Sequence, residues 1–172
     1  MRRNVVGRCI TWCGFAALLT GAAPSAVAAE RYQIHISPMP FNDATHSVMT
    51  GKGTATATLD GETLTVAGTF AGLASEATKA HLAVSRGPGI PGTTVFELVV
   101  SPDVAGKITG KVTLRASQLA ALKSGRLYVR IDTVKVPSGT LWGWLLPDYE
   151  TAGQDVPQKG PWYIPPFAVK TE

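Results

Sequence analysis

The sequence predicts an all-β domain built as a two-sheet Greek-key sandwich, with a small closed barrel as the alternative. Three observations support this prediction. Apolar and polar residues alternate in about seven or eight short stretches, glycine and proline separate these stretches, and a single short stretch has a helical pattern. No helical stretch is long enough to form a layer, so strands must supply the core.

The first 29 residues have the composition of a secretory signal peptide. Two arginines follow Met1, a strongly apolar run extends roughly from Cys9 to Leu19, and small residues accumulate toward Ala29. The alternative, a membrane anchor, needs a longer apolar run, because a spanning helix takes about 20 residues. We therefore expect a periplasmic or secreted protein whose mature chain has no membrane span.

Removal of this segment changes the composition of the mature chain. Both cysteines, Cys9 and Cys13, lie inside it, so the mature chain would have no disulfide and no thiolate metal site. Without Arg2, Arg3 and Arg8, 13 of the 16 basic residues remain against 12 acidic ones, a net charge of +1. This balance argues against a nucleic-acid partner, because binding to phosphates needs clustered positive charge.

The N-terminal region 30–48 is predicted to hold one strand and a loop. Tyr32, Ile34 and Ile36 alternate with polar residues before two prolines end the pattern. We expect this region to precede the main domain, which we place at residues 49–146.

Residues 51–70 predict a β-hairpin. Asp60 and Gly61 are expected to form its two-residue turn, because glycine tolerates the positive φ that such turns need. Ala57 then faces Leu64. Alternation along both strands predicts one buried face of leucine, alanine and valine and one solvent-exposed face of threonines.

Three further strands are predicted after the hairpin. Residues 79–84 alternate between apolar and polar side chains, and so do residues 108–114. Residues 94–100 are apolar on both faces apart from Glu97, which predicts a central strand covered on both sides.

Residues 117–125 break the strand pattern and predict one or two turns of helix. Ser117 could cap its start, Lys123 lies near its end, and Gly125 follows.

Two more strands are predicted at residues 127–132 and 140–145. In the first, Arg130 and Asp132 share a face, where we expect a surface ion pair that contributes little to stability. In the second, Trp142 and Trp144 share a face. For these tryptophans, packing beneath the C-terminal tail is favoured over a carbohydrate-binding platform.

Residues 147–172 are predicted to form an irregular tail rich in proline and aromatic residues. Trp162, Tyr163 and Phe167 are its apolar anchors. Two interpretations stay open: a strap that covers apolar surface of one sheet, or a docking segment for a protein partner, since an extended proline-rich chain loses little entropy on binding.

Candidate metal ligands are few. The mature chain has three histidines, His35, His46 and His81, and the position two residues after His81 is alanine, so no pair of imidazoles lies on one strand face. No motif for a nucleophilic serine is present and no cysteine remains in the mature chain. We therefore expect a protein that is not an enzyme and has no cofactor.

Several stretches resemble the CHRD domain, which is named for chordin and occurs in many exported bacterial proteins. The resemblance lies in residues 53–61, 64–73, 80–82, 119–129 and 139–145. It implies a β-sandwich similar to that of copper/zinc superoxide dismutase and no established enzymatic activity for the bacterial members. Chordin itself suggests binding of extracellular proteins.

The histidines depart from the pattern of the family. Many members have Ala-His-Ile-His where residues 80–83 are Ala-His-Leu-Ala, and many have further histidines where residues 132–135 are Asp-Thr-Val-Lys. A metal role carried over from the family would therefore depend on His81.

These observations lead to two functional hypotheses. The first is an exported, non-enzymatic binding or accessory module that contacts a protein partner through Trp142, Trp144 and the tail. The alternative is a periplasmic copper or zinc protein built around His81 with His35 or His46.

Overall fold

The computed structural model describes residues 29–148. Within them lie nine strands and one helix: β1 (Glu30–Pro38), β2 (Lys52–Asp60), β3 (Thr63–Ala71), β4 (Ala77–Val84), β5 (Thr93–Val100), β6 (Gly106–Thr113), α1 (Ala116–Lys123), β7 (Leu127–Thr133), β8 (Leu141–Trp144) and β9 (Leu146–Pro147). For the described residues, the prediction of an all-β fold with one short helix is confirmed. The predicted signal peptide and residues 149–172 of the predicted tail lie outside the described residues.

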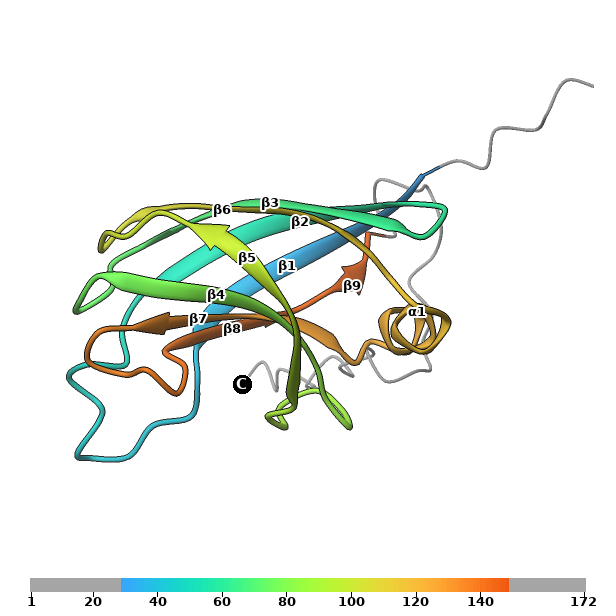
Figure 1. The fold of residues 1–172 in the computed structure, drawn as a ribbon. Helices are drawn as coiled ribbons and strands as arrows, with labels where there is room; N and C mark the ends of the chain where they lie inside the picture. Colours follow the sequence, from blue (N-terminus) through green and yellow to red (C-terminus); the bar gives the residue numbers. More distant parts are fainter. Residues whose placement is uncertain (1–28, 149–172) are drawn as a thin grey trace, which may run out of the picture.

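Eight of these strands close into one antiparallel, barrel-like sheet (Figure 1). The order around it is β1-β2-β3-β6-β5-β4-β7-β8, and β8 returns to β1, where Ser37 opposes Trp142. The sheet therefore has the closed form that was the alternative to two separate sheets. β1 belongs to the same sheet as the strands of the 49–146 region, because it pairs with both β2 and β8.

Strands β1 and β5 join the two layers of this barrel. β5 pairs with β4 through residues 93–98 and with β6 through Val99 and Val100. β1 pairs with β2 through residues 30–36 and with β8 through its last two residues. Figure 1 shows β1, β2, β3 and β6 in one layer and β4, β7 and β8 in the other. A strand that changes partners along its length turns the corner between layers.

The turn of the β2–β3 hairpin differs from the predicted one. Gly61 and Glu62 form the loop, because Asp60 pairs with Thr63. The prediction of an Asp60-Gly61 turn is therefore wrong by one residue. Gly61 has a φ of +59°, which suits the first loop position of a type II′ turn.

The predicted faces of this hairpin are nevertheless correct. Ala57 and Val66 oppose each other and point into the barrel, where both are buried. Thr56 and Thr65 are exposed on the outside. Moving the turn by one residue changes the pairing by two, and a period of two leaves every side chain on its original face.

The interior of the barrel is filled by side chains that alternate along each strand. Fully buried members include Ile34, Leu64, Leu82, Ile108 and Ile131. Each comes from a different strand, so one apolar core holds the two layers together.

The strand covered on both faces is β7, and the prediction that residues 94–100 have this role is wrong. Val99 of β5 is 71% exposed, because the outer face of β5 meets solvent. In β7, Val129 packs in the barrel core while Tyr128, on the opposite face, is also fully buried.

Helix α1 lies between β6 and β7 and begins one residue before the predicted start. Its first turn is closed by Gln118 Oε1, which accepts the backbone N–H of Arg115 at 2.8 Å, so Ser117 is not the cap. Ala121 and Leu122 point into the core and cover one end of the barrel (Figure 1).

Pro147, the first residue of the predicted tail, belongs to a strand and not to an irregular segment. Leu146 and Pro147 form β9, which pairs with Gln33 and Tyr32 at the start of β1. No helix within residues 29–148 has the length and apolar character that a membrane crossing requires.

Candidate functional site

Four loops gather at one end of the barrel, which we call the loop end. They are residues 39–51, 72–76, 101–105 and 134–140, which connect β1 to β2, β3 to β4, β5 to β6 and β7 to β8. Neighbouring strands are antiparallel all round the barrel, so β1, β3, β5 and β7 run toward this end and β2, β4, β6 and β8 run away from it. Helix α1 lies at the opposite end.

Hydrogen bonds between the four loops hold the loop end together. Each loop is bonded to another element of this end at 2.9 to 3.1 Å: Met39 N–H to Thr140 O, Thr50 Oγ1–H to Gly72 O, Leu73 N–H to Val104 O, Val134 N–H to Glu76 O, and Lys135 N–H to Ser75 Oγ. Loops bonded in this way are pre-organised, which lowers the entropic cost of binding at their surface.

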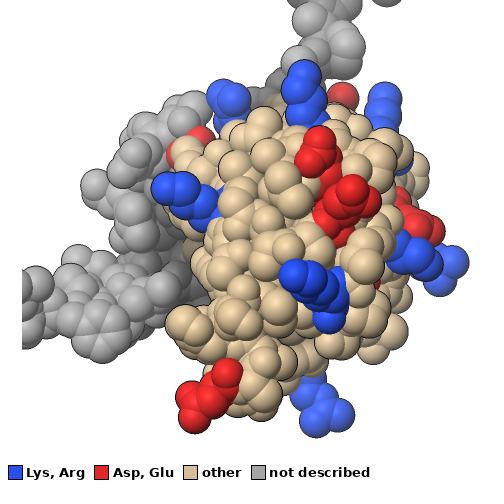
Figure 2. Space-filling model, turned by 90° about the vertical axis from the view of Figure 1, so that its left-hand side faces the viewer, with Lys and Arg blue, Asp and Glu red and all other residues tan. Residues whose placement is uncertain are grey.

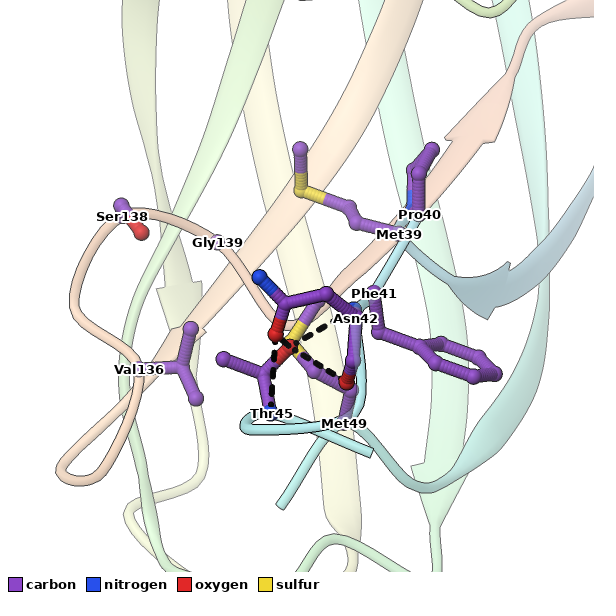
Figure 3. Close-up of a pocket in the computed structure, with 9 residues that line it drawn as sticks. All are labelled: Met39, Pro40, Phe41, Asn42, Thr45, Met49, Val136, Ser138 and Gly139. Atoms are coloured by element: carbon purple, nitrogen blue, oxygen red, sulfur yellow. Dashed lines mark hydrogen bonds between the residues drawn. The ribbon is translucent and has the colours of Figure 1, made fainter. Parts of the chain in front are cut away.

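A groove of about 440 Å³ separates the first and the last of these loops (Figure 3). Most of its lining is apolar. The lining residues are Met39, Pro40, Phe41, Asn42, Thr45, Met49, Val136, Ser138 and Gly139. Methionine side chains adapt to differently shaped apolar ligands, and they recur at binding surfaces that accept more than one partner.

One wall of the groove is a turn built on Asn42. Its Oδ1 accepts the backbone N–H and the hydroxyl of Thr45, both at 3.1 Å, and its carbonyl oxygen accepts the N–H of His46 at 2.9 Å. In Figure 3 the amide nitrogen of Asn42 points away from these bonds, toward the space beside Met39. The turn therefore leaves one amide donor facing the groove.

Apolar side chains are exposed on three of the four loops of the loop end, and one of them, Phe41, lines the groove. Within residues 29–148, the large apolar residues that are exposed are Phe41, Ile90, Val99, Val104 and Val134. Phe41, Val104 and Val134 belong to loops of the loop end. Figure 2 faces this end: most of the surface that it shows belongs to uncharged residues, several basic side chains lie toward its edge, and some acidic side chains and a basic one lie nearer its middle. Exposed apolar side chains that gather in one place mark interaction sites.

His81 lies elsewhere, on the outer face of β4, where it contacts Asp132 of β7. His81 Nε2 lies 3.0 Å from Asp132 Oδ2, and Arg130 Nε donates to Asp132 Oδ1 at 2.8 Å. The Asp132 side chain is 5% exposed and that of His81 is 12% exposed. The predicted pair of Arg130 and Asp132 is thus present, but the expectation of a surface pair is wrong because Asp132 is buried.

The structure does not bring the three histidines into one site. His35 is exposed on β1, and His46 packs edge-on against Phe41 with ring centroids 5.4 Å apart. Among residues 29–148, no three His, Cys, Asp or Glu side chains lie where they could hold a metal ion. The described residues therefore do not fit a copper or zinc ion at His81.

Trp142 and Trp144 form an outer aromatic face with Tyr128. The centroids of the Tyr128 and Trp144 rings are 5.2 Å apart and stacked, and those of Trp142 and Trp144 are 4.6 Å apart and edge-on. Tyr128 accepts the N–H of Gly92 at 2.9 Å through its hydroxyl oxygen. As predicted, the two tryptophans share a face, and Trp142 is only 7% exposed. The other predicted contact residues, Trp162, Tyr163 and Phe167, lie outside the described residues.

A family model described as the CHRD domain matches residues 15–145 of this chain. The chain belongs to the CHRD domain family. No curated protein and no solved structure matches it. The match to the CHRD domain includes β1, in agreement with the pairing of β1 with β2 and β8.

Sequence reasoning missed the loop end of this CHRD domain. For Met39 and Phe41 the sequence predicts only a loop, and Met49 lies at the start of the predicted main domain. The signal that could have revealed the site is the presence of three large apolar side chains in a connection without strand or helix pattern, since connections lie on the surface and carry binding residues.

Proposed function

We propose that this CHRD domain protein is an exported, non-catalytic module that binds a protein partner through its loop end. The observation that carries the proposal is the apolar groove between residues 39–49 and 134–140, with Phe41 half exposed at its border. This surface replaces Trp142 and Trp144 as the proposed contact with another protein, because Trp142 is already buried within its own chain while Phe41 is exposed.

The chemistry of the groove favours a partner that inserts apolar side chains. Two methionines and Val136 offer adaptable apolar contacts, and Phe41 offers an aromatic anchor. Aromatic anchors contribute much of the energy of protein interfaces. The Asn42 amide can donate a hydrogen bond to a carbonyl of the partner, which would orient a peptide chain along the groove.

The order of the strands around the barrel supports the proposed Greek-key topology. The connections from β3 to β4 and from β6 to β7 each pass over two strands, which is the pattern of a Greek key. The same strand order, together with the family resemblance, supports our proposal that the fold is similar to that of copper/zinc superoxide dismutase. Export is proposed from the composition of residues 1–29.

Photo-crosslinking from Phe41 tests the binding proposal. A benzoylphenylalanine at position 41 is produced in cells that naturally make this protein, and the same residue at position 65 serves as the control, since Thr65 is exposed on the outer face of β3. We expect a discrete adduct with one protein from position 41 and none from position 65.

Competition makes the experiment decisive. Excess unmodified protein should remove the adduct, while excess of a Phe41→Ser/Val134→Ser variant should not. Equal labelling from positions 41 and 65, or equal competition by both proteins, rules out the loop end as the binding surface.

A further inference from the structure

Two polar atoms on the outer face of β4, β7 and β8 are buried and have no hydrogen-bond partner among the described residues. They are Nδ1 of His81 and Nε1 of Trp144. His81 pairs across the sheet with Arg130, and Trp144 pairs with Tyr128. Since residues 128 and 130 share a face of β7, both atoms lie on the same outer surface of the barrel.

Buried polar groups in native proteins are almost always paired, so each of these atoms indicates a missing partner. Water is a poor candidate beside Trp144, because a buried water needs two to four polar contacts. The neighbours of Trp144 in its cluster are Tyr128, Trp142, Ala83 and Met39. The Tyr128 hydroxyl is already bonded to Gly92.

The rest of the chain departs from a point close to this surface. Only Leu145 and β9 separate Trp144 from Asp148, whose N–H donates to Arg31 O at 2.9 Å. Residues 149–160 can extend over about 40 Å, and the outer faces of β4, β7 and β8 span only about 10 Å from strand to strand. The proline-rich residues 161–167 can therefore reach this surface.

The chemistry of residues 161–167 complements the two unpaired atoms. Their sequence, Pro-Trp-Tyr-Ile-Pro-Pro-Phe, favours an extended polyproline conformation, which makes no internal hydrogen bonds and leaves its carbonyl oxygens free. Such a carbonyl can accept the indole N–H of Trp144. When His81 Nε2–H donates to Asp132, Nδ1 is an acceptor that a backbone N–H between the prolines can satisfy.

We propose that the outer aromatic face, Tyr128, Trp142 and Trp144, binds residues 161–167 of the same chain, with Trp144 Nε1 donating to a backbone carbonyl of that segment. This interaction goes beyond the proposed function, because it uses the outer face of β7 and β8, which shares only Met39 with the lining of the loop-end groove.

Chymotrypsin cleavage after Trp162 and Tyr163 tests this interaction in the purified full-length chain. Mass spectrometry follows the C-terminal fragments. A docked segment is cut only when it opens, so its cleavage rate reports the open population. The Trp144→Phe variant keeps an aromatic ring and removes the donor. We expect it to raise the cleavage rate roughly tenfold, the equivalent of about 1.4 kcal/mol, and the control Phe41→Leu to leave the rate unchanged.

Other outcomes overturn the proposal. If wild-type protein is cut as fast as a synthetic peptide of residues 156–172, the segment is not docked. If wild-type protein is cut slowly and the Trp144→Phe variant is cut equally slowly and has the same thermal midpoint, the segment docks somewhere else. If protection disappears on dilution together with a dimer in light scattering, the segment comes from a second copy. Loss of the crosslink from position 41 would contradict the proposed function, but it would not change the expected cleavage rates.

Discussion

Arg130 and Asp132, two residues apart on β7, form a two-point ion pair on the outer face of the barrel. Arg130 Nε lies 2.8 Å from Oδ1 and its terminal nitrogen Nη2 lies 3.1 Å from Oδ2. Asp132 Oδ2 also meets His81 across the strand pair, so one buried carboxylate joins β4 to β7.

We expect Asp132→Asn to lower the free energy of unfolding by about 3 kcal/mol, because it removes one partner of a buried ion pair and leaves Arg130 uncompensated. Urea denaturation followed by circular dichroism measures the change. Asp43→Asn is the matched control at an exposed position, with an expected change within about 0.5 kcal/mol. Equal stabilities of the two variants would show that the carboxylate does not hold the strands together.

The hairpin turn provides a test of backbone strain. Gly61 has a φ of +59°, and a Cβ built there would meet no atom within 4 Å. Gly61→Ala is therefore expected to destabilise the protein by about 1 to 2 kcal/mol through conformation alone. Gly87→Ala is the control, since it has the same free space and no positive φ. Thermal unfolding of both variants decides whether the turn begins at residue 61.

The closure of the barrel depends on Gly143. A Cβ at this position would lie 2.6 Å from the carbonyl oxygen of His35 and 2.8 Å from an Ile34 methyl group. Gly143→Ala should push β8 away from β1 and cost about 2 to 3 kcal/mol.

Gly110 offers the comparison for this variant. A Cβ there would meet the end of the Leu98 side chain at 2.4 Å. A leucine can rotate where a backbone oxygen cannot, so Gly110→Ala should cost less, about 1 kcal/mol. The denaturant midpoints of the two variants measure their stabilities. A Gly110→Ala variant less stable than Gly143→Ala would contradict the tight contact between β1 and β8.

The groove should respond to changes in the Asn42 turn without loss of the fold. Asn42→Ala removes the side-chain acceptor of the Thr45 N–H and hydroxyl and leaves them only the longer or shared bonds to the Asn42 carbonyl oxygen. We expect the Thr45 amide to exchange with solvent about five times faster, the effect of about 1 kcal/mol of hydrogen bonding. The thermal midpoint should stay within about 2 °C. Hydrogen exchange by NMR measures both this amide and, as the control, that of Val66 in the core.

Alternation along single strands was enough to predict most of the fold. The inward positions of Ile34, Ala57 and Val66 follow from a period of two, which depends only on neighbours in the sequence. The exact turn of the hairpin did not follow, because Asp60-Gly61 and Gly61-Glu62 both fit a glycine with positive φ. Alternation alone cannot distinguish them, since both put the same side chains inward.

The site was harder to predict because its parts are distant in the sequence. The contact of His81 with Asp132 requires β4 and β7 to be neighbours, and two strands and a helix lie between them in the chain. The burial of Tyr128 likewise needs Gly92 and Trp144 to meet it from other strands or loops. Strand order, which decides these contacts, is not encoded in the pattern of any one strand.

The pairing of Ser37 with Trp142 joins the first long strand of the barrel to the last of the eight. A chain that is made or threaded from its N-terminus therefore cannot complete the cylinder until nearly all of it has emerged. Until then β1 and β8 leave unpaired backbone edges, which invite pairing with other chains. Contacts that span so much of the sequence also form slowly, so these edges stay exposed for longer than the edges of a sheet closed by local contacts.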